Sequence, residues 1–143
     1  MTESGSDTGQ RGEMERMKQE IEELRSHQKE SDFIFTQNPN PILIWNRDLK
    51  VVNVNDAFIK ATGWSREKSM SATLQDFVYL DKKGEGLAET AKDRTTKVGE
   101  ATFQFPSGIV TWVRHTIPIL DNNGNIDKIL SVYNDITEIK KLQ

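Results

Sequence analysis

The stretch from Ala101 to Thr137 most constrains what this chain can fold into. It contains three runs of alternating apolar and polar residues, separated by the turn signals Pro106-Ser107-Gly108 and Asn122-Asn123-Gly124. Period-two alternation is typical of half-buried strands, and turn residues between such runs indicate hairpins. The stretch therefore predicts three consecutive antiparallel strands, which end at Asn134-Asp135-Ile136-Thr137.

Two shorter β-patterned runs and a helical region precede this stretch. Residues 42–45 and 50–54 flank a polar turn and predict another hairpin. Asn55 is then a suitable N-cap for a helix over 56–62, with Gly63 in the position typical of a helix end, and a weaker helix is expected at 85–95. The predicted fold class is α+β, a five-stranded antiparallel sheet with short helices between strands two and three, preceded by an amphipathic helix.

The long strand over 109–120 has two different faces. Val113, His115, Ile117 and Ile119 share one face, and Trp112, Arg114, Thr116 and Pro118 share the other. We expect the first face to point into the space between sheet and helices. The predicted lining of a ligand pocket is therefore Phe58, Leu87, Val113, His115 and Ile117.

The N-terminal region differs in composition from the rest. Residues 1–12 are polar and rich in Ser, Thr and Gly, which predicts a disordered tail. Residues 13–31 predict a helix whose apolar positions follow the 3-4-3 spacing of a coiled-coil seam: Met14, Met17, Ile21 and Leu24. Two heptads are marginal alone, so this helix either pairs with a partner helix or lies as a solvated helix on its own domain.

Residues 32–137 are then expected to form the folded domain, and residues 138–143 the start of a connector helix. Asp135 is a candidate N-cap for that helix, Glu138 would complete a capping box, and Thr137 can hydrogen-bond locally. Two compatible interpretations stay open for Asp135, Thr137 and Glu138: a simple helix cap, or a hinge that joins the sheet to the outgoing helix. The end of the chain inside this helix suggests a fragment of a longer protein.

Charge and composition exclude several classes of function. The net charge of −3 lies entirely in residues 1–31, and the remainder has 14 acidic and 14 basic residues. Such a balance is a poor match for nucleic acid, and no apolar run is long enough to span a membrane. Cysteine is absent, which fits a reducing, cytoplasmic compartment and excludes thiol chemistry and Cys-ligated metals.

The order of elements and several short motifs resemble the PAS domain family. The resemblance covers about residues 32–143. It depends on Val54-Asn55-Asp56-Ala57-Phe58 and Thr62-Gly63-Trp64-Ser65 in the first half, and on Gly108, Trp112-Val113, Pro118-Ile119, Asp121, Gly124 and Asp135-Ile136-Thr137 in the second. The chain departs from the family in the first hairpin turn, where Asp48-Leu49-Lys50 has no glycine, and a different turn geometry is expected there.

The resemblance implies a sensor, relay and dimerisation module of a larger signal-transduction protein. The effector domain would lie downstream, with a sensor histidine kinase of a two-component system as the first candidate. The expected assembly is a homodimer through the coiled-coil-like helix, without contact to nucleic acid or membrane. The alternatives are a PAS module of a chemoreceptor or transcription regulator, or a stand-alone sensor that binds a small ligand, flavin or haem.

The sequence predicts no catalytic residue, no metal site and no cofactor. It has no phosphate-binding loop and no paired acid–base motif. For His115, a hydrogen-bonded core residue is the first interpretation, and ligand contact, pH sensing and haem ligation are the others. Haem-binding relatives take their histidine from the helical half, where residues 56–97 have none, and flavin-adduct relatives need a cysteine. The polar segment 81–99 favours a small polar ligand or none.

Overall fold

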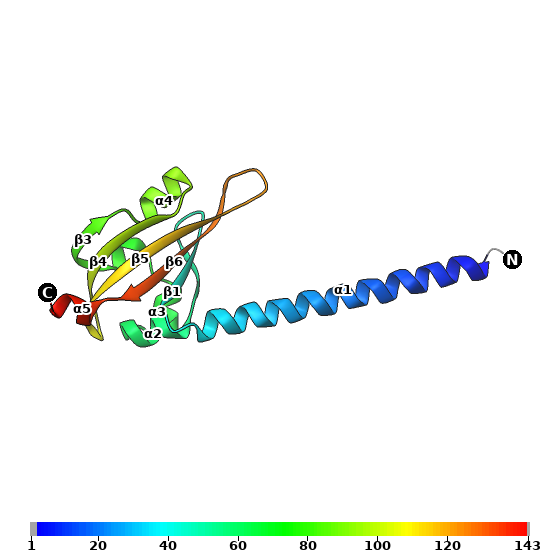
Figure 1. Cartoon of the computed structure of the whole chain (residues 1–143), viewed down its shortest axis with the longest axis horizontal. Coiled ribbons are helices and arrows are strands. Elements are labelled where there is room, and N and C mark those ends of the chain that lie inside the picture. The colour runs from blue at the N-terminus through cyan, green and yellow to red at the C-terminus, as the bar shows by residue number, and fades with distance from the viewer. Residues whose placement is uncertain (1–2, 143) are drawn as a thin grey trace. The chain divides into compact units, whose positions relative to one another are not determined.

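The computed structural model describes residues 3–142, and it divides into two units, the second of which begins at Thr36. The first unit consists of most of α1, a continuous helix from Glu3 to Gln37 (Figure 1). None of the helices described within residues 3–142 combines the length and apolarity that crossing a bilayer requires.

Helix α1 extends farther in both directions than the predicted range 13–31. Residues 3–12, where the sequence predicts disorder, are helical despite Gly9 and Gly12. Extending an existing helix costs much less than nucleating one, so isolated glycines need not end it. At its C-terminal end α1 continues past the predicted limit at residue 31 and stops at Gln37, just before the Asn38-Pro39-Asn40-Pro41 segment, whose prolines cannot continue a helix.

The second unit is an antiparallel sheet of six strands, in the order β2-β1-β6-β5-β4-β3. The strands are β1 (Ile42–Asn46), β2 (Val51–Val54), β3 (Val78–Gly84), β4 (Lys97–Phe105), β5 (Gly108–Leu120) and β6 (Ile126–Asp135). The predicted α+β class and the five predicted strands are confirmed, and β3 is the additional strand. It lies at the sheet edge, pairs only with β4 and is largely exposed, so its Asp81-Lys82-Lys83 run gave no strand pattern.

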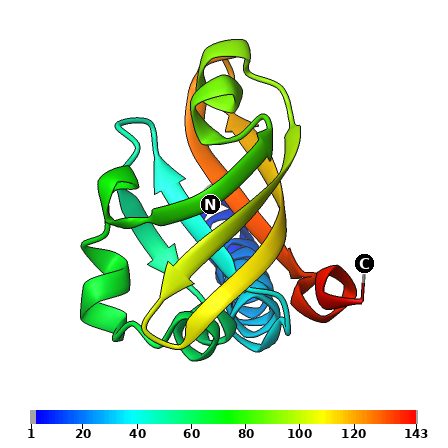
Figure 2. The same ribbon diagram turned by 90° about the vertical axis from the view of Figure 1, so that its left-hand side faces the viewer.

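Four short helical segments lie between β2 and β4, and Figure 2 shows this part of the chain wrapped across the curved sheet. They are α2 (Asp56–Thr62), α3 (Arg66–Met70), the 3-10 turn η1 (Leu74–Asp76) and α4 (Leu87–Asp93), and α5 (Thr137–Lys141) follows β6. The predicted limits of α2 are confirmed. Its side-chain cap is Asn55, and Gly63 follows in the left-handed conformation with φ of 77°.

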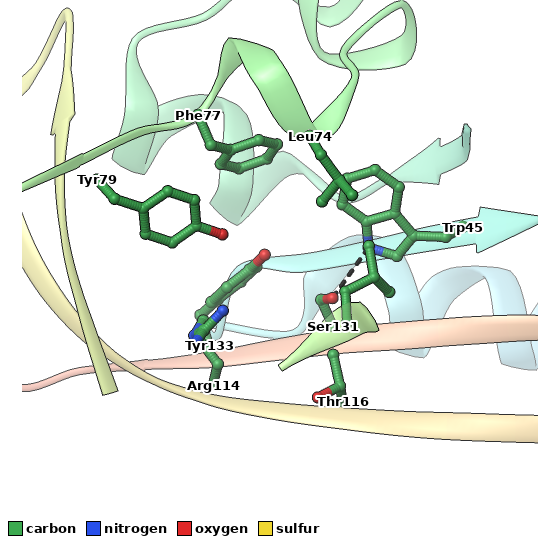
Figure 3. Close-up of a pocket in the computed structure, with 9 residues that line it drawn as sticks. Trp45, Leu74, Phe77, Tyr79, Arg114, Thr116, Ser131 and Tyr133 are labelled. Atoms are coloured by element: carbon green, nitrogen blue, oxygen red, sulfur yellow. Dashed lines mark hydrogen bonds between the residues drawn. The ribbon is translucent and has the colours of Figure 1, made fainter. Parts of the chain in front are cut away.

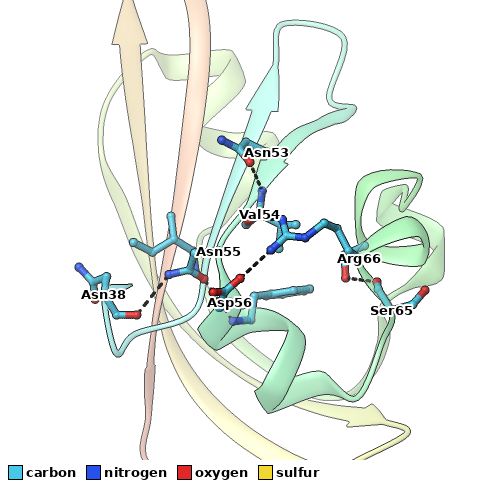
Figure 4. A network of polar contacts seen from close by, with 10 residues as sticks. Asn38, Asn53, Val54, Asn55, Asp56, Ser65 and Arg66 are labelled. Carbon is cyan, nitrogen blue, oxygen red and sulfur yellow. Dashed lines mark hydrogen bonds and ion pairs between the residues drawn. The ribbon is translucent and has the colours of Figure 1, made fainter. Parts of the chain in front are cut away.

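Asn55 is also the centre of a buried polar network that joins the start of the sheet to α2 (Figure 4). Its Oδ1 accepts hydrogen bonds from the backbone N–H groups of Ile42 (2.9 Å) and Phe58 (3.1 Å). Its Nδ2 donates to the carbonyl oxygens of Asn40 (2.9 Å) and Asn38 (3.4 Å). One side chain therefore satisfies polar groups of β1, α2 and the segment before β1.

The first hairpin turn contains no glycine, and its geometry is unusual, as the sequence predicts. Leu49 adopts the left-handed conformation with φ of 59°. The Asn46 side chain supports this turn, since its Oδ1 accepts from the N–H groups of Asp48 (2.9 Å) and Lys50 (3.0 Å).

Strand β5 presents the opposite face to the core from the one predicted. Trp112, Arg114 and Thr116 are buried in the core, while Val113, His115 and Ile117 lie half-buried on the outer face. The outer face is itself apolar, because the β6 neighbours of His115 and Ile117 are Val132 and Leu130. Hydrophobicity along β5 alone therefore indicated the wrong face.

The core is a cluster of aromatic side chains between the sheet and the short helices. Phe58 of α2 is fully buried, with ring centroids 6.0–6.4 Å from those of Trp64, Phe77, Phe105, Trp112 and Tyr133. Trp45 and Trp112 are both core residues. This packing fixes the inner face of β5 and β6, on which the pocket described next is built.

Candidate ligand pocket and exit helix

A small cavity lies against the inner face of β1, β5 and β6, with η1, β3 and α4 forming its other walls (Figure 3). Its lining combines aromatic, aliphatic and polar side chains: Trp45, Leu74, Phe77, Tyr79, Leu87, Arg114, Thr116, Ser131 and Tyr133. The free volume is about 10 Å³, which corresponds to one water molecule.

Arg114 is the unusual member of this lining. It is only 4% exposed, and neither its Nε nor its Nη2 atom has a hydrogen-bond partner within residues 3–142. Its guanidinium carbon lies 5.7 Å from the centre of the Tyr79 ring, a distance at which a cation and an aromatic ring attract. No ion pair of Arg114 occurs among the side chains that the structure describes. The pocket therefore holds a buried positive charge to which the described part of the chain supplies no counter-ion.

Two glycines make room for this guanidinium group. A Cβ atom at Gly86 would lie 2.6 Å from Nη1 of Arg114, and one at Gly99 would lie 3.0 Å from Nη2. A Cβ at Gly99 would also overlap the carbonyl oxygen of Glu85. Any larger residue at either position would displace Arg114 or the backbone of β4.

Two tyrosines add neutral polar groups beside the charge. Arg114 and Tyr133 are cross-strand neighbours, and Figure 3 shows the hydroxyl groups of Tyr79 and Tyr133 on the same side of the pocket. Burial raises the pKa of both hydroxyls above the usual range, and for Tyr79 the nearby Arg114 charge partly opposes this. Both phenols therefore stay protonated and able to donate hydrogen bonds at neutral pH.

One carboxylate whose pKa the Arg114 charge influences, that of Glu89, is already engaged elsewhere. Glu89, in the first turn of α4, accepts a hydrogen bond from the N–H of Gly86 at 3.0 Å. Backbone hydrogen bonds, above all that of Gly86, lower the pKa of Glu89, and the Arg114 charge contributes less. Glu89 thus caps α4 while making no ion pair with Arg114.

The predicted pocket residues are divided between the two faces of the sheet. Leu87 lines the cavity, and Phe58 belongs to the aromatic core beside it. Val113, His115 and Ile117 lie on the outer face, so they do not share a pocket with Leu87. Sequence reasoning missed Arg114, Tyr79 and Tyr133. The available signal was the charged Arg114 between Trp112 and Thr116 on one face of a central strand.

The exit from the sheet is held by side-chain contacts to β5. Thr137, the first residue of α5, donates its N–H to Oδ1 of Asp135 at 2.9 Å, and its hydroxyl also donates to that oxygen. The Thr137 hydroxyl oxygen accepts the N–H of Thr111 at 3.0 Å, and the N–H of Ile136 donates to the Thr111 carbonyl at 2.9 Å. Lys140 adds an ion pair with Glu100 of β4 at 3.2 Å.

The exit differs in detail from the predicted capping box. The residue at the N-cap position is Ile136, which makes no side-chain cap. Glu138 is exposed and contacts Lys141 at 3.4 Å rather than the backbone before the helix. Asp135 instead forms a local turn with Thr137, because its short side chain reaches the N–H two residues on. Asp135 and Thr137 are therefore the residues that tie α5 to the sheet.

The predicted seam residues of α1 all lie on the surface. Met14, Met17, Ile21 and Leu24 are between 45% and 68% exposed. Among the residues that the structure describes, no three acidic, histidine or cysteine side chains gather closely enough to hold a metal ion.

Comparisons with known proteins agree with this architecture. A family model described as "PAS domain" matches residues 39–138. The search of curated proteins found no match.

Solved structures supply the similarity in fold. The PAS domain of an HTR-like protein from Haloarcula marismortui is 16% identical, covers 83% of this chain and 99% of its own, and has a TM-score of 0.62. A PAS domain from a two-component sensor histidine kinase is also 16% identical, with coverage of 78% and 98% and a TM-score of 0.62. The PAS domain of the fruit-fly ELK potassium channel is 16% identical, with coverage of 76% and 96% and a TM-score of 0.61. With a family model that matches most of its length and structural neighbours that are PAS domains, the chain belongs to the PAS domain family of sensory modules.

Proposed function

We propose that this chain is a sensor, relay and dimerisation module of a cytoplasmic signal-transduction protein, and that its parent is a sensor histidine kinase of a two-component system. The observation that carries the proposal is the continuity of β5. Arg114 and Thr116 of this strand line the pocket, and Thr111 of the same strand anchors α5 through both its N–H and its carbonyl. A displacement of β5 at the pocket would therefore reach the exit helix through direct contacts.

The anchoring contact can be tested in the chain itself. Thr137→Val keeps the shape of the side chain but leaves the Thr111 N–H without its acceptor. We expect a loss of about 1 kcal/mol in the free energy of unfolding and about tenfold faster hydrogen exchange at the Thr111 amide. Thr95→Val, at an exposed position before β4, is the matched control and should change neither value. Unchanged exchange at Thr111 would contradict a role of Thr137 in holding α5.

The proposed dimer is supported by the apolar stripe of α1. Met14, Met17, Ile21 and Leu24 repeat at coiled-coil spacing and are exposed in the single chain, so pairing with a second α1 would remove them from water. The outer face of the sheet also leaves Val98 and Ile119 exposed.

Ile21→Glu is expected to convert the dimer into a monomer, because it places a charge in the seam. Light scattering after size-exclusion chromatography should give twice the 16.3 kDa mass of one chain for the natural protein and the single mass for the variant. Glu22→Gln, a neighbouring change outside the seam, should leave the dimer intact. A natural protein that is monomeric at high micromolar concentration would refute the dimer.

The class of the parent protein needs a separate experiment. The full-length gene product, incubated with labelled ATP, should acquire an acid-labile phosphohistidine. Failure to do so would exclude the kinase while leaving the tests of Thr137 and Ile21 valid. The absence of a cofactor stays a prediction, which the visible absorption spectrum of the freshly purified protein tests.

A further inference from the structure

We propose that the pocket binds a small organic carboxylate of one to three carbons, held by Arg114 through a two-point hydrogen bond. This inference specifies the signal for the sensor function proposed above and rests on it. It stands on the burial, missing partners and geometry of Arg114.

The first step is the cost of the charge. A guanidinium group cannot lose its proton at physiological pH, and an unpaired ion away from water is disfavoured by several kcal/mol. Buried charges are therefore normally paired. Arg114 is buried, lacks an ion pair among the described residues, and lies within cation–π distance of the Tyr79 ring. A bound anion would supply the missing partner.

The second step is the direction of the free donors. Nε and Nη2 are the two nitrogens on one edge of the guanidinium plane, and their N–H bonds are parallel. The two oxygens of a carboxylate accept from such an edge simultaneously, which a spherical halide cannot do. Within the described residues, the two Arg114 nitrogens that lack a hydrogen-bond partner are the two on this one edge.

The third step is the surroundings. The protonated hydroxyls of Tyr79 and Tyr133 lie in the same pocket and can donate to a carboxylate oxygen (Figure 3). Leu74, Phe77 and Leu87 supply an apolar wall for a short hydrocarbon chain. A polar end opposite an apolar end matches a short carboxylic acid in its ionised form.

The fourth step is size. A free volume of about 10 Å³ holds a water molecule but not a carboxylate, so the pocket must widen. Leu74 and Leu87 belong to η1 and α4, elements of three and seven residues. Such short elements open at lower free energy than the central strands. The modest space restricts the ligand to a few atoms and its affinity to roughly 10⁻⁵–10⁻³ M.

Acetate is the ligand for the test, with sodium chloride at equal ionic strength as the reference. The Nε–H signal of Arg114 in ¹⁵N-labelled protein should shift in a saturable manner with acetate and not with chloride. At about 100 mM acetate the melting temperature should rise by roughly 5 °C or more over the chloride sample. Formate and propionate, which have one and three carbons, test the lower and upper limits of the proposed ligand length.

The variants separate the carboxylate site from a general salt effect. Arg114→Met should weaken acetate binding by at least about 100-fold, because it removes both charge-assisted hydrogen bonds. If that variant does not fold, Tyr79→Phe, which keeps the ring and loses only the hydroxyl, should weaken binding by about fivefold. Arg47→Met, at an exposed arginine, should bind acetate like the natural protein.

Two results would overturn the proposal: an Arg114 signal that responds equally to acetate and chloride, or one that responds to neither because only water occupies the cavity. Saturable binding that Arg47→Met retains and Arg114→Met loses would support it.

The relay is judged separately, by whether acetate changes hydrogen exchange at Thr111 and in α5. Binding without that change supports the pocket and contradicts the relay, and loss of binding leaves the Thr137 and Ile21 tests unaffected.

Discussion

Phe58→Ala is expected to lower the free energy of unfolding of the second unit by about 3–5 kcal/mol. Phe58 is fully buried, and its ring packs against five other aromatic side chains, which come from the segments between α2 and β3 and from β4, β5 and β6. Replacing it by alanine removes the transfer free energy of the ring and leaves a cavity that rigid neighbouring rings cannot fill. Domains of this size have only about 5–15 kcal/mol of stability, so much of the protein would unfold on warming.

Urea unfolding followed by tryptophan fluorescence measures this loss, because all three tryptophans lie in the second unit. Phe58→Leu keeps most of the volume and should lose only about 1 kcal/mol. Val78→Ala, at an exposed position of the edge strand β3, should change stability by less than about 0.5 kcal/mol. A loss below about 1 kcal/mol for Phe58→Ala would mean that the aromatic cluster is not packed as described.

Asn55→Ala is expected to cost about 2–4 kcal/mol, although it removes only a small polar side chain. The side chain is 1% exposed and makes four hydrogen bonds to backbone groups, two as acceptor and two as donor. Alanine would leave the N–H of Ile42 and the carbonyl of Asn40 buried without partners, and α2 would lose its cap. Leaving buried groups unpaired accounts for most of the expected loss, since the cap alone contributes about 1 kcal/mol.

The matched control is Asn53→Ala, two residues earlier. Asn53 is exposed, and its side chain accepts only the adjacent N–H of Val54. Its replacement should change stability by less than about 0.5 kcal/mol. Equal unfolding midpoints for Asn53→Ala and Asn55→Ala would show that the buried network contributes nothing to stability.

Asn55 shows that a sequence encodes a local helix cap much more clearly than a contact between distant segments. The limits of α2 were predictable because Asn55, Asp56 and Gly63 act on backbone groups within a few residues of themselves. The second role of Asn55, in binding β1 and the segment before it, involves residues 13 or more positions away. No local pattern carries that information.

The pocket was the least predictable part of the molecule. Alternation along β5 gives the period of the strand but not which face is inside, and both faces of this strand have residues that can be buried. Trp112 is inside because the aromatic rings of α2, β4 and β6 pack against it. Arg114 is two residues after Trp112 and therefore lies on the same inner face of the strand, whereas His115 lies on the outer face.

The sequence by itself determined the features that neighbouring residues control: the three long strands and their turns, and the limits of α2. The tertiary structure alone decided the polar edge strand β3, the inner face of β5, and the direct contact of Thr137 with Thr111 in place of a capping box. Those features depend on which distant segments supply hydrogen bonds and apolar surface. The unpaired charge of Arg114 belongs to this second group, because a charge can be seen to lack a partner only when every neighbour in space is known.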